Sequence, residues 1–308
     1  MRIDRDVETV DDQRMTQTTP TRKVIVGYAD RCSLPAVDWA VQEAELRSAT
    51  ACVVSCYHVP SDAHAEVVRA PIAEVERAEA AAGLDLQFVV EPMRQRHPKV
   101  RFESEVVPGP AHTALAAMTT PDDILVLGSH HCAGPRDLWL ASTARRTARH
   151  LAGPLVVVRQ PNTPKYLRRI VVGVDDWGAS VAALRWAADE AELHGIDLLI
   201  VHAWTFPYAG MGAHADHAQE LTRCEAECLL ERSAEEARKR CTSAISTELI
   251  EGGPAASLLG VVRDRDLLVV GSRGRGLLRS ALFGSTTNAL LETSPVSVVV
   301  VRDPPPPN

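Results

Sequence analysis

Residues 266–302 read "DLLVVGSRGRGLLRSALFGSTTNALLETSPVSVVVVR". The stretch begins and ends with continuously apolar segments, and a glycine-rich loop and a helical pattern lie between them. Apolar runs without alternation are typical of strands that are buried on both faces of a parallel sheet. Because parallel neighbours need a long crossover, the stretch predicts a strand–helix–strand unit of an α/β fold.

A second copy of this unit lies 143 residues upstream. The segment "VLGSHHCAGPRDLWLASTARRTA" at 126–148 aligns with 269–291, and "VVVR" at 156–159 aligns with the same letters at 299–302 without a gap. Self-similarity at a fixed offset is the mark of a repeated structural unit. The chain is therefore predicted to contain two copies of one module.

The beginning of each module repeats as well. "KVIVGYADRCSLPAVDWA" from residue 23 matches "RIVVGVDDWGASVAALRWA" from residue 169, with offsets of 146 before the first turn and 147 after it. Apolar strands alternate with helical patterns, among them a polar helix at 216–241, a strand at 245–251 and a helix at 254–263. Right-handed crossovers then favour an open, doubly wound, Rossmann-like parallel sheet in each module.

Domain boundaries follow from the linker "QPNTPKYL", which is rich in proline and polar residues. We expect one domain at 21–160 with a degenerate glycine pattern and another at 167–303 with the intact pattern. Residues 1–20 are polar and acidic, and we expect them to form a disordered tail.

Composition excludes several classes of function. The net charge of -7 disfavours general attraction to nucleic acid or to an anionic membrane. No apolar run reaches the roughly 18 residues that a membrane span needs, and the first residues lack the apolar centre of a secretion signal. The seven cysteines form no CxxC pair. We therefore expect a cytoplasmic protein without a metal site.

The second module places its candidate ligand site where parallel strands end. Asp175 follows the first strand and Gly271 ends the fourth, and ligands in open α/β sheets bind beyond the carboxyl ends of strands. If the two strands are neighbours, Asp175 and Gly271 face each other across the crevice. Gly271 and Gly274 are predicted to let the backbone approach a ligand closely and to adopt positive φ.

The next helix is predicted to begin at Gly284 with bare amide groups. Ser285 and Thr286 then stand at its positive end, where unpaired N–H groups and hydroxyls suit a phosphate. The loop has neither the lysine of a Walker motif nor a GxGxxG pattern. The residues by themselves leave open the alternative that these glycines and hydroxyls serve only turns and helix caps.

The spacing of Gly271, Gly274, Gly284 and Ser285 matches the pattern G-2x-G-9x-G-[S/T]. In this the chain resembles the ATP-binding class of the universal stress protein family, in its tandem-domain actinobacterial type. The resemblance implies an adenine nucleotide alpha hydrolase-like fold with a five-stranded parallel sheet of order 3-2-1-4-5 in each domain. It also implies that the final strands, 155–158 and 297–301, pair between domains in an internal pseudo-dimer, with a homodimer of chains as a further expectation.

The resemblance also implies roles for single residues around bound ATP. Asp175 and Ala203 are expected near the adenosine, and Asp175 could instead cap a helix or bind the magnesium of the nucleotide. The ribose and phosphates are expected to contact Gly271, Arg273 and Gly274, and the phosphate tail to contact Gly284, Ser285 and Thr286. His202, which precedes Ala203, is expected to be structural rather than catalytic.

The first module departs from the pattern. His131 and Ala141 replace Gly274 and Gly284, and Ala29 or Asp30 replaces Asp175, depending on where its missing residue falls. A Cβ atom at the position of Gly284 would be strained if that position needs positive φ. We therefore expect one nucleotide per chain, in the second module.

The function expected from these features is that of a nucleotide-dependent regulatory protein in a stress response. No catalytic residue is assigned, because no lysine or base accompanies the phosphate site, and hydrolysis would at most be slow. The alternatives are a slow ATPase, a cyclic AMP binder, and a structural protein that acts by association without any ligand.

Overall fold

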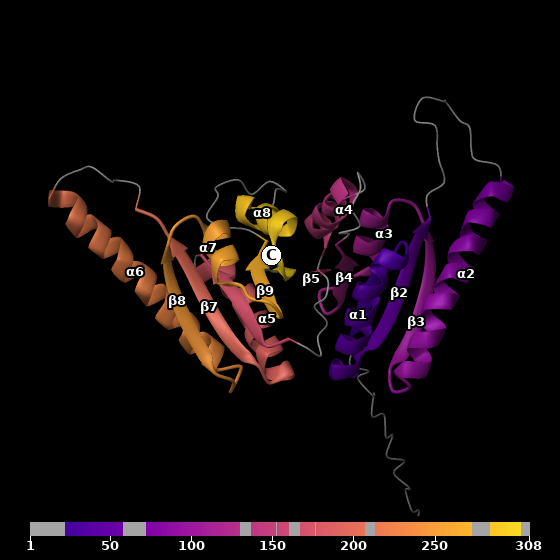
Figure 1. Ribbon diagram of the computed structural model, residues 1–308, viewed down its shortest axis with the longest axis horizontal. Coiled ribbons are helices and arrows are strands. Elements are labelled where there is room, and N and C mark those ends of the chain that lie inside the picture. Colours follow the sequence, from indigo (N-terminus) through magenta and orange to yellow (C-terminus); the bar gives the residue numbers. More distant parts are fainter. Residues whose placement is uncertain are drawn as a thin grey trace, which may run out of the picture.

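The computed structural model describes residues 22–57, 72–129, 137–151, 153–159, 167–175, 177–206, 213–272 and 284–302. These residues form two α/β units that share one sheet (Figure 1). None of the described helices is long and apolar enough to cross a membrane.

The elements of the first unit alternate as the sequence predicts. They are β1 (Lys23–Tyr28), a 3-10 turn η1 (Arg31–Ser33), α1 (Leu34–Arg47), β2 (Thr50–Tyr57), α2 (Ile72–Arg96), β3 (Arg101–Pro108), α3 (Ala111–Met118), β4 (Ile124–Gly128), α4 (Asp137–His150) and β5 (Leu155–Val158).

The second unit repeats this order of elements. They are β6 (Arg169–Val174), α5 (Trp177–His194), β7 (Asp197–Trp204), α6 (Ala213–Arg238), β8 (Ile245–Glu251), α7 (Pro254–Val261), β9 (Asp266–Gly271), α8 (Ser285–Thr293) and β10 (Ser297–Val301). Helix α6 begins and ends three residues earlier than predicted. Beyond its end, the Lys239 and Arg240 amides bond to the carbonyls of Glu236 and Ala237, three residues back, which is the tighter pattern of a closing turn.

The strand order confirms the predicted fold. The sheet runs β3-β2-β1-β4-β5-β10-β9-β6-β7-β8, so each unit has the order 3-2-1-4-5 when its strands are numbered along the chain. Neighbouring strands are parallel within each unit. Strands β5 and β10 pair antiparallel, with Val299 opposite Val156. The two domains therefore pack in one continuous sheet, and β3 and β8 form its edges.

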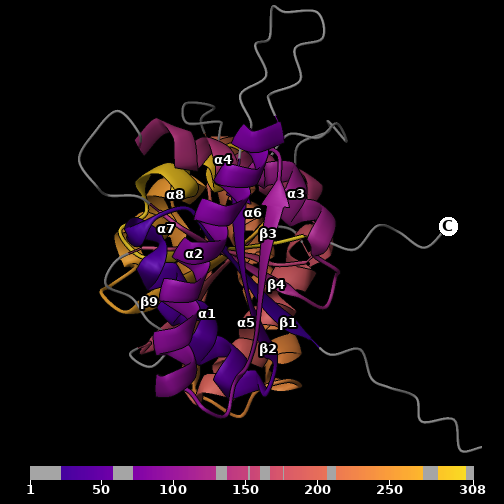
Figure 2. The same cartoon turned by 90° about the vertical axis from the view of Figure 1, so that its right-hand side faces the viewer.

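Helices cover both faces of the sheet (Figures 1 and 2). On one face α1, α2, α5 and α6 pack over residues such as Val24 and Val172, and on the other α3, α4, α7 and α8 pack over residues such as Ile25 and Val171. Successive strand residues thus serve opposite faces, which is why the strands are apolar without interruption.

Two repeat-related glycines set the distance between sheet and helix. A Cβ atom on Gly173 would lie 2.9 Å from Leu258 Cδ1 on α7, and a Cβ atom on Gly27 would lie 2.9 Å from Leu127 Cδ2 and 3.0 Å from Leu115 Cδ1. Neither glycine has a positive φ. Both positions therefore require glycine because a side chain would collide with the helix or strand packed there, and not because the backbone needs a glycine conformation.

We expect Gly173→Val to lower the free energy of unfolding by about 1–3 kcal/mol, because its methyl groups would overpack the contact with Leu258. Urea unfolding measures this change. Gly260→Val on α7 is the matched control, since a Cβ atom at Gly260 meets nothing within 4 Å. Equal losses for the two variants would contradict the packing argument.

Candidate functional site

The strands that carry the predicted site lie next to one another. Strand β6 pairs with β9, with Val172 opposite Val269, and with β7, with Val174 opposite His202. Asp175 directly follows β6, Gly271 ends β9, and Ala203 lies near the end of β7. The carboxyl ends of parallel strands lie on the same side of a sheet, so these three residues lie together at the carboxyl ends of the second domain's strands.

The end of β6 is held by two hydrogen bonds. The amide of Asp175 donates to Ser180 Oγ at 2.8 Å, and Nδ1 of the buried His202 lies 2.7 Å from the Val174 carbonyl oxygen. A carbonyl only accepts, so the Nδ1 atom carries the proton. His202 therefore fixes the strand end beside Asp175, which agrees with the structural role expected for it.

The first domain shows which residue replaces Asp175. The amide of Ala29 donates to Ser33 Oγ at 3.1 Å, as the amide of Asp175 does to Ser180. Ala29 is thus the counterpart of Asp175. The neighbouring Asp30 instead accepts a 2.8 Å hydrogen bond from the Cys32 amide and caps the 3-10 turn. The equivalent position in the first domain accordingly lacks a carboxylate.

Helix α8 begins directly beside the end of β9. Thr287 Oγ1 donates to the Gly271 carbonyl at 2.9 Å, and the Gly284 amide donates to the Ser272 carbonyl at 3.4 Å. Gly284 is the N-cap residue, and no side chain caps the first turn within the part of the chain described. Ser285 is exposed and Thr286 is half-buried there. An uncapped first turn of this kind presents amide groups that an anion can bind.

The predicted positive φ at Gly271 is wrong. Among the described glycines, only Gly109, Gly195 and Gly252 have positive φ. Gly271 stays extended because it continues the β9 ladder opposite Val301. Gly284 is also ordinary, with φ -56° and ψ 148°, so a Cβ atom there would not be strained by the backbone.

Two of the predicted contacts, Arg273 and Gly274, belong to the segment 273–283, which lies outside the described residues, as does His131 in the first domain. The structure brings together the other six, namely Asp175, Ala203, Gly271, Gly284, Ser285 and Thr286, at the ends of β6, β7 and β9 and the start of α8.

Ser272 is a residue that the sequence analysis missed. Its side chain is buried, and its Oγ atom has no hydrogen-bond partner among the residues that the structure describes. The repeat-related Ser129 Oγ, in contrast, donates to the Val158 carbonyl at 2.9 Å. A buried hydroxyl without a partner is unfavourable by about 1–3 kcal/mol. The comparison of the two copies could not find it, because both have serine there.

The sequences of known proteins with the same arrangement of two domains are similar to this chain. The sequence model of the universal stress protein family matches residues 20–159 and 167–302. Universal stress protein Rv2623 of Mycobacterium tuberculosis H37Rv is 30% identical over 294 residues, which cover 91% of this chain and 96% of that protein. Universal stress protein Rv1996 of the same organism is 27% identical, over 91% of this chain and 95% of its own length.

A solved structure shares the arrangement of both domains. The crystal structure of a universal stress protein from Archaeoglobus fulgidus DSM 4304 superposes with a TM-score of 0.64 and covers 92% of this chain and 96% of its own. Its sequence identity is 14%, so this likeness shows the fold alone.

Proposed function

Because this chain belongs to the universal stress protein family, in a tandem form with two family domains, we propose that it is a regulatory protein that binds ATP in its second domain. The single observation that carries the proposal is the start of α8. Its first turn has no side-chain cap among the described residues, and it begins beside Ser272, whose buried hydroxyl has no partner within that same part of the chain. A phosphate would accept hydrogen bonds from both groups.

The rest of the nucleotide would extend along the carboxyl ends of the same strands. Strands β6 and β9 are paired, so Asp175 after β6 would lie near the end of β9. Ala203 on β7 would offer a small side chain for an adenine to pack on. A magnesium ion carried by the nucleotide would find a carboxylate in Asp175. In this proposal Arg273 and Gly274 follow the ribose and phosphates, as the resemblance implies.

The first domain is proposed to lack a nucleotide. It has Ala29 in place of Asp175, and His131 and Ala141 in place of two glycines of the pattern. Its Ser129 hydroxyl is bonded to the Val158 carbonyl and would have to leave that partner to meet a phosphate. The expected stoichiometry is therefore one ATP per chain.

The experiment that tests the proposal is titration calorimetry of the full chain with ATP, ADP and cyclic AMP, together with mass spectrometry of small molecules released from protein purified without added ligand. We expect ATP to bind at one site. Stronger binding of cyclic AMP would favour the cyclic nucleotide alternative, and no binding would favour association without ligand. Accumulation of ADP over hours with magnesium would indicate slow hydrolysis.

A further inference from the structure

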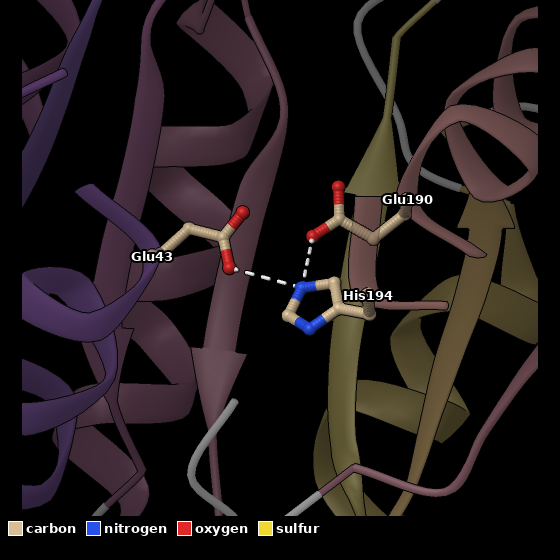
Figure 3. A group of neighbouring side chains, drawn as sticks. All are labelled: Glu43, Glu190 and His194. Carbon is tan, nitrogen blue, oxygen red and sulfur yellow. Dashed lines mark hydrogen bonds and ion pairs between the residues drawn. The ribbon is translucent and has the colours of Figure 1, made fainter. Parts of the chain in front are cut away.

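A buried cluster of charged side chains joins the two domains on the face of the sheet that α1 and α5 cover. Glu43 and Arg47 lie one turn apart on α1, and Glu190 and His194 lie one turn apart on α5. The repeat offset of 147 pairs Glu43 with Glu190 and Arg47 with His194. The two halves are thus related by the repeat, except that one cation is arginine and the other is histidine. Figure 3 shows His194 between the carboxylates of Glu43 and Glu190.

The four side chains form a closed ring. Arg47 binds Oε1 of Glu43 through Nε and Oε2 of Glu190 through its Nη2 atom. His194 Nε2 lies 3.2 Å from Oε2 of Glu43 and 3.1 Å from Oε1 of Glu190. Arg47 therefore takes one oxygen of each carboxylate and His194 takes the other. The Arg47–Glu190 and His194–Glu43 contacts both cross from one domain to the other.

Burial makes the charge balance of the ring important. Both glutamates are fully buried, at 0% exposure, and the His194 side chain is 5% exposed. Removing a compensating charge from a buried carboxylate is strongly unfavourable. While both carboxylates are ionised they need two cations, and Arg47 supplies one permanently. His194 supplies the second only while its ring is protonated.

We propose that this ring is a proton-dependent clasp between the two domains, closed while His194 is protonated and weakened when it becomes neutral. The repeat supports this proposal, because Arg47 of the first domain, which is always charged, stands at the position equivalent to His194. One of the two cross-domain bridges thus depends on a proton while its repeat-related partner does not. The inference rests on the domain packing and does not depend on nucleotide binding.

A pocket lies next to the ring. This pocket has a volume of about 190 Å³ and is partly lined by Arg47 and Glu190. The other charged groups that face it, with their partners where the structure shows them, are Arg22, Asp122, Lys23, which pairs with Glu103, and Asp189, which pairs with Arg240. The pocket therefore borders the side of the ring on which Arg47 meets Glu190.

The surroundings of His194 place its titration at alkaline pH. Burial lowers the pKa of His194, but the hydrogen bonds to Glu190 and Glu43 outweigh burial and raise this pKa to about 9. Because the folded pKa lies above the unfolded value of about 6.5, the stabilisation is complete below pH 6.5 and is lost as the pH rises through 9.

The two carboxylates respond to the ring in opposite directions. Burial raises the pKa of Glu43, but the His194 hydrogen bond and the Arg47 charge outweigh burial, so that this pKa falls below its usual value. Burial and the charge of Glu43 raise the pKa of Glu190 above its usual value. Glu43 thus stabilises the fold above its unfolded pKa, whereas the contribution of Glu190 is present at low pH and declines as the pH rises.

The test compares the unfolding of the wild-type chain with that of His194→Arg, which restores the symmetry of the ring and supplies a permanent cation. Urea unfolding at pH 6 to 10 gives the ratio of the two unfolding constants. We expect this ratio to change by about 10- to 100-fold between pH 6.5 and 9, with the wild type losing stability. His217→Arg, at an exposed position on α6, controls for the added arginine.

Two further measurements keep the proposal testable if His194→Arg folds poorly. The NMR resonance of His194, assigned by its loss in His194→Gln, should titrate near pH 9, and hydrogen exchange of β5 and β10 amides should quicken above that pH relative to amides of β2. A resonance that titrates at or below pH 6.5 would overturn the proposal. So would a Zn²⁺-dependent rise of the wild-type unfolding midpoint that His194→Arg lacks, because the cluster would then be a metal site.

Discussion

Replacing Gly284 by valine is expected to weaken ATP binding by at least tenfold, which corresponds to about 1.4 kcal/mol or more. The isopropyl group would stand over the first turn of α8, where the phosphate tail is proposed to meet the amide groups of the helix. Since φ at Gly284 is -56°, valine fits the backbone there. The loss of affinity should therefore come from blocked access rather than from misfolding.

Titration calorimetry of the full chain measures this effect, and the urea midpoint checks that the variant is folded. We expect the midpoint to fall only slightly, because valine is a poorer N-cap than glycine by about 1 kcal/mol or less. The matched control is Ala141→Val, at the equivalent position of the first domain. Two ATP molecules per chain, both retained in Gly284→Val, would contradict the assignment of the site to the second domain.

The fold could be predicted from the sequence because the repeat and the apolar strands report the same architecture. Segments such as 169–174 and 266–271 are apolar almost throughout because helices cover both faces of the sheet, whereas a strand with one solvated face would alternate. The pairing of β5 with β10 did not follow from the residues alone. Two apolar final strands were visible, but their antiparallel contact was an implication of the resemblance.

The candidate site was predicted less completely, for physical reasons that differ between residues. The positive φ expected at Gly271 failed because glycine is equally compatible with an extended ladder, and sequence does not distinguish the two uses. The choice between Ala29 and Asp30 needed a hydrogen bond, that of the Ala29 amide to Ser33. Among the described residues the Ser272 hydroxyl has no partner, which depends on a side-chain geometry that its counterpart Ser129 does not share.

The clasp between the domains was missed although its signal was present in the sequence. Glu43 and Arg47 share the i, i+4 spacing of Glu190 and His194, and the repeat relates the two pairs. On a single helix such a pattern is typical of an exposed ion pair. Here the shared sheet places α1 and α5 next to each other, where Glu43, Glu190 and His194 are buried and the Arg47 side chain is 18% exposed.

The largest loss of stability is expected from Val299→Asp. Val299 lies on β10 at 0% exposure, opposite Val156 of β5 and beside Val269 of β9. An aspartate there would place a carboxylate without a partner in the seam between the domains, which costs several kcal/mol. Because the whole domain pair has a net stability of about 5–15 kcal/mol, we expect a loss of about 4 kcal/mol or more.

Calorimetry and hydrogen exchange separate this effect from a local one. Val299→Thr is the control, since threonine has nearly the same shape and only exchanges one methyl group for a hydroxyl, for which we expect a stability loss of about 1–3 kcal/mol. In Val299→Asp, β5 amides of the first domain should lose protection although the substitution lies in the second domain, because β10 is the hydrogen-bonded neighbour of β5. Unchanged protection of β5 would mean that the two domains are stable independently and that the continuous sheet contributes little to holding them together.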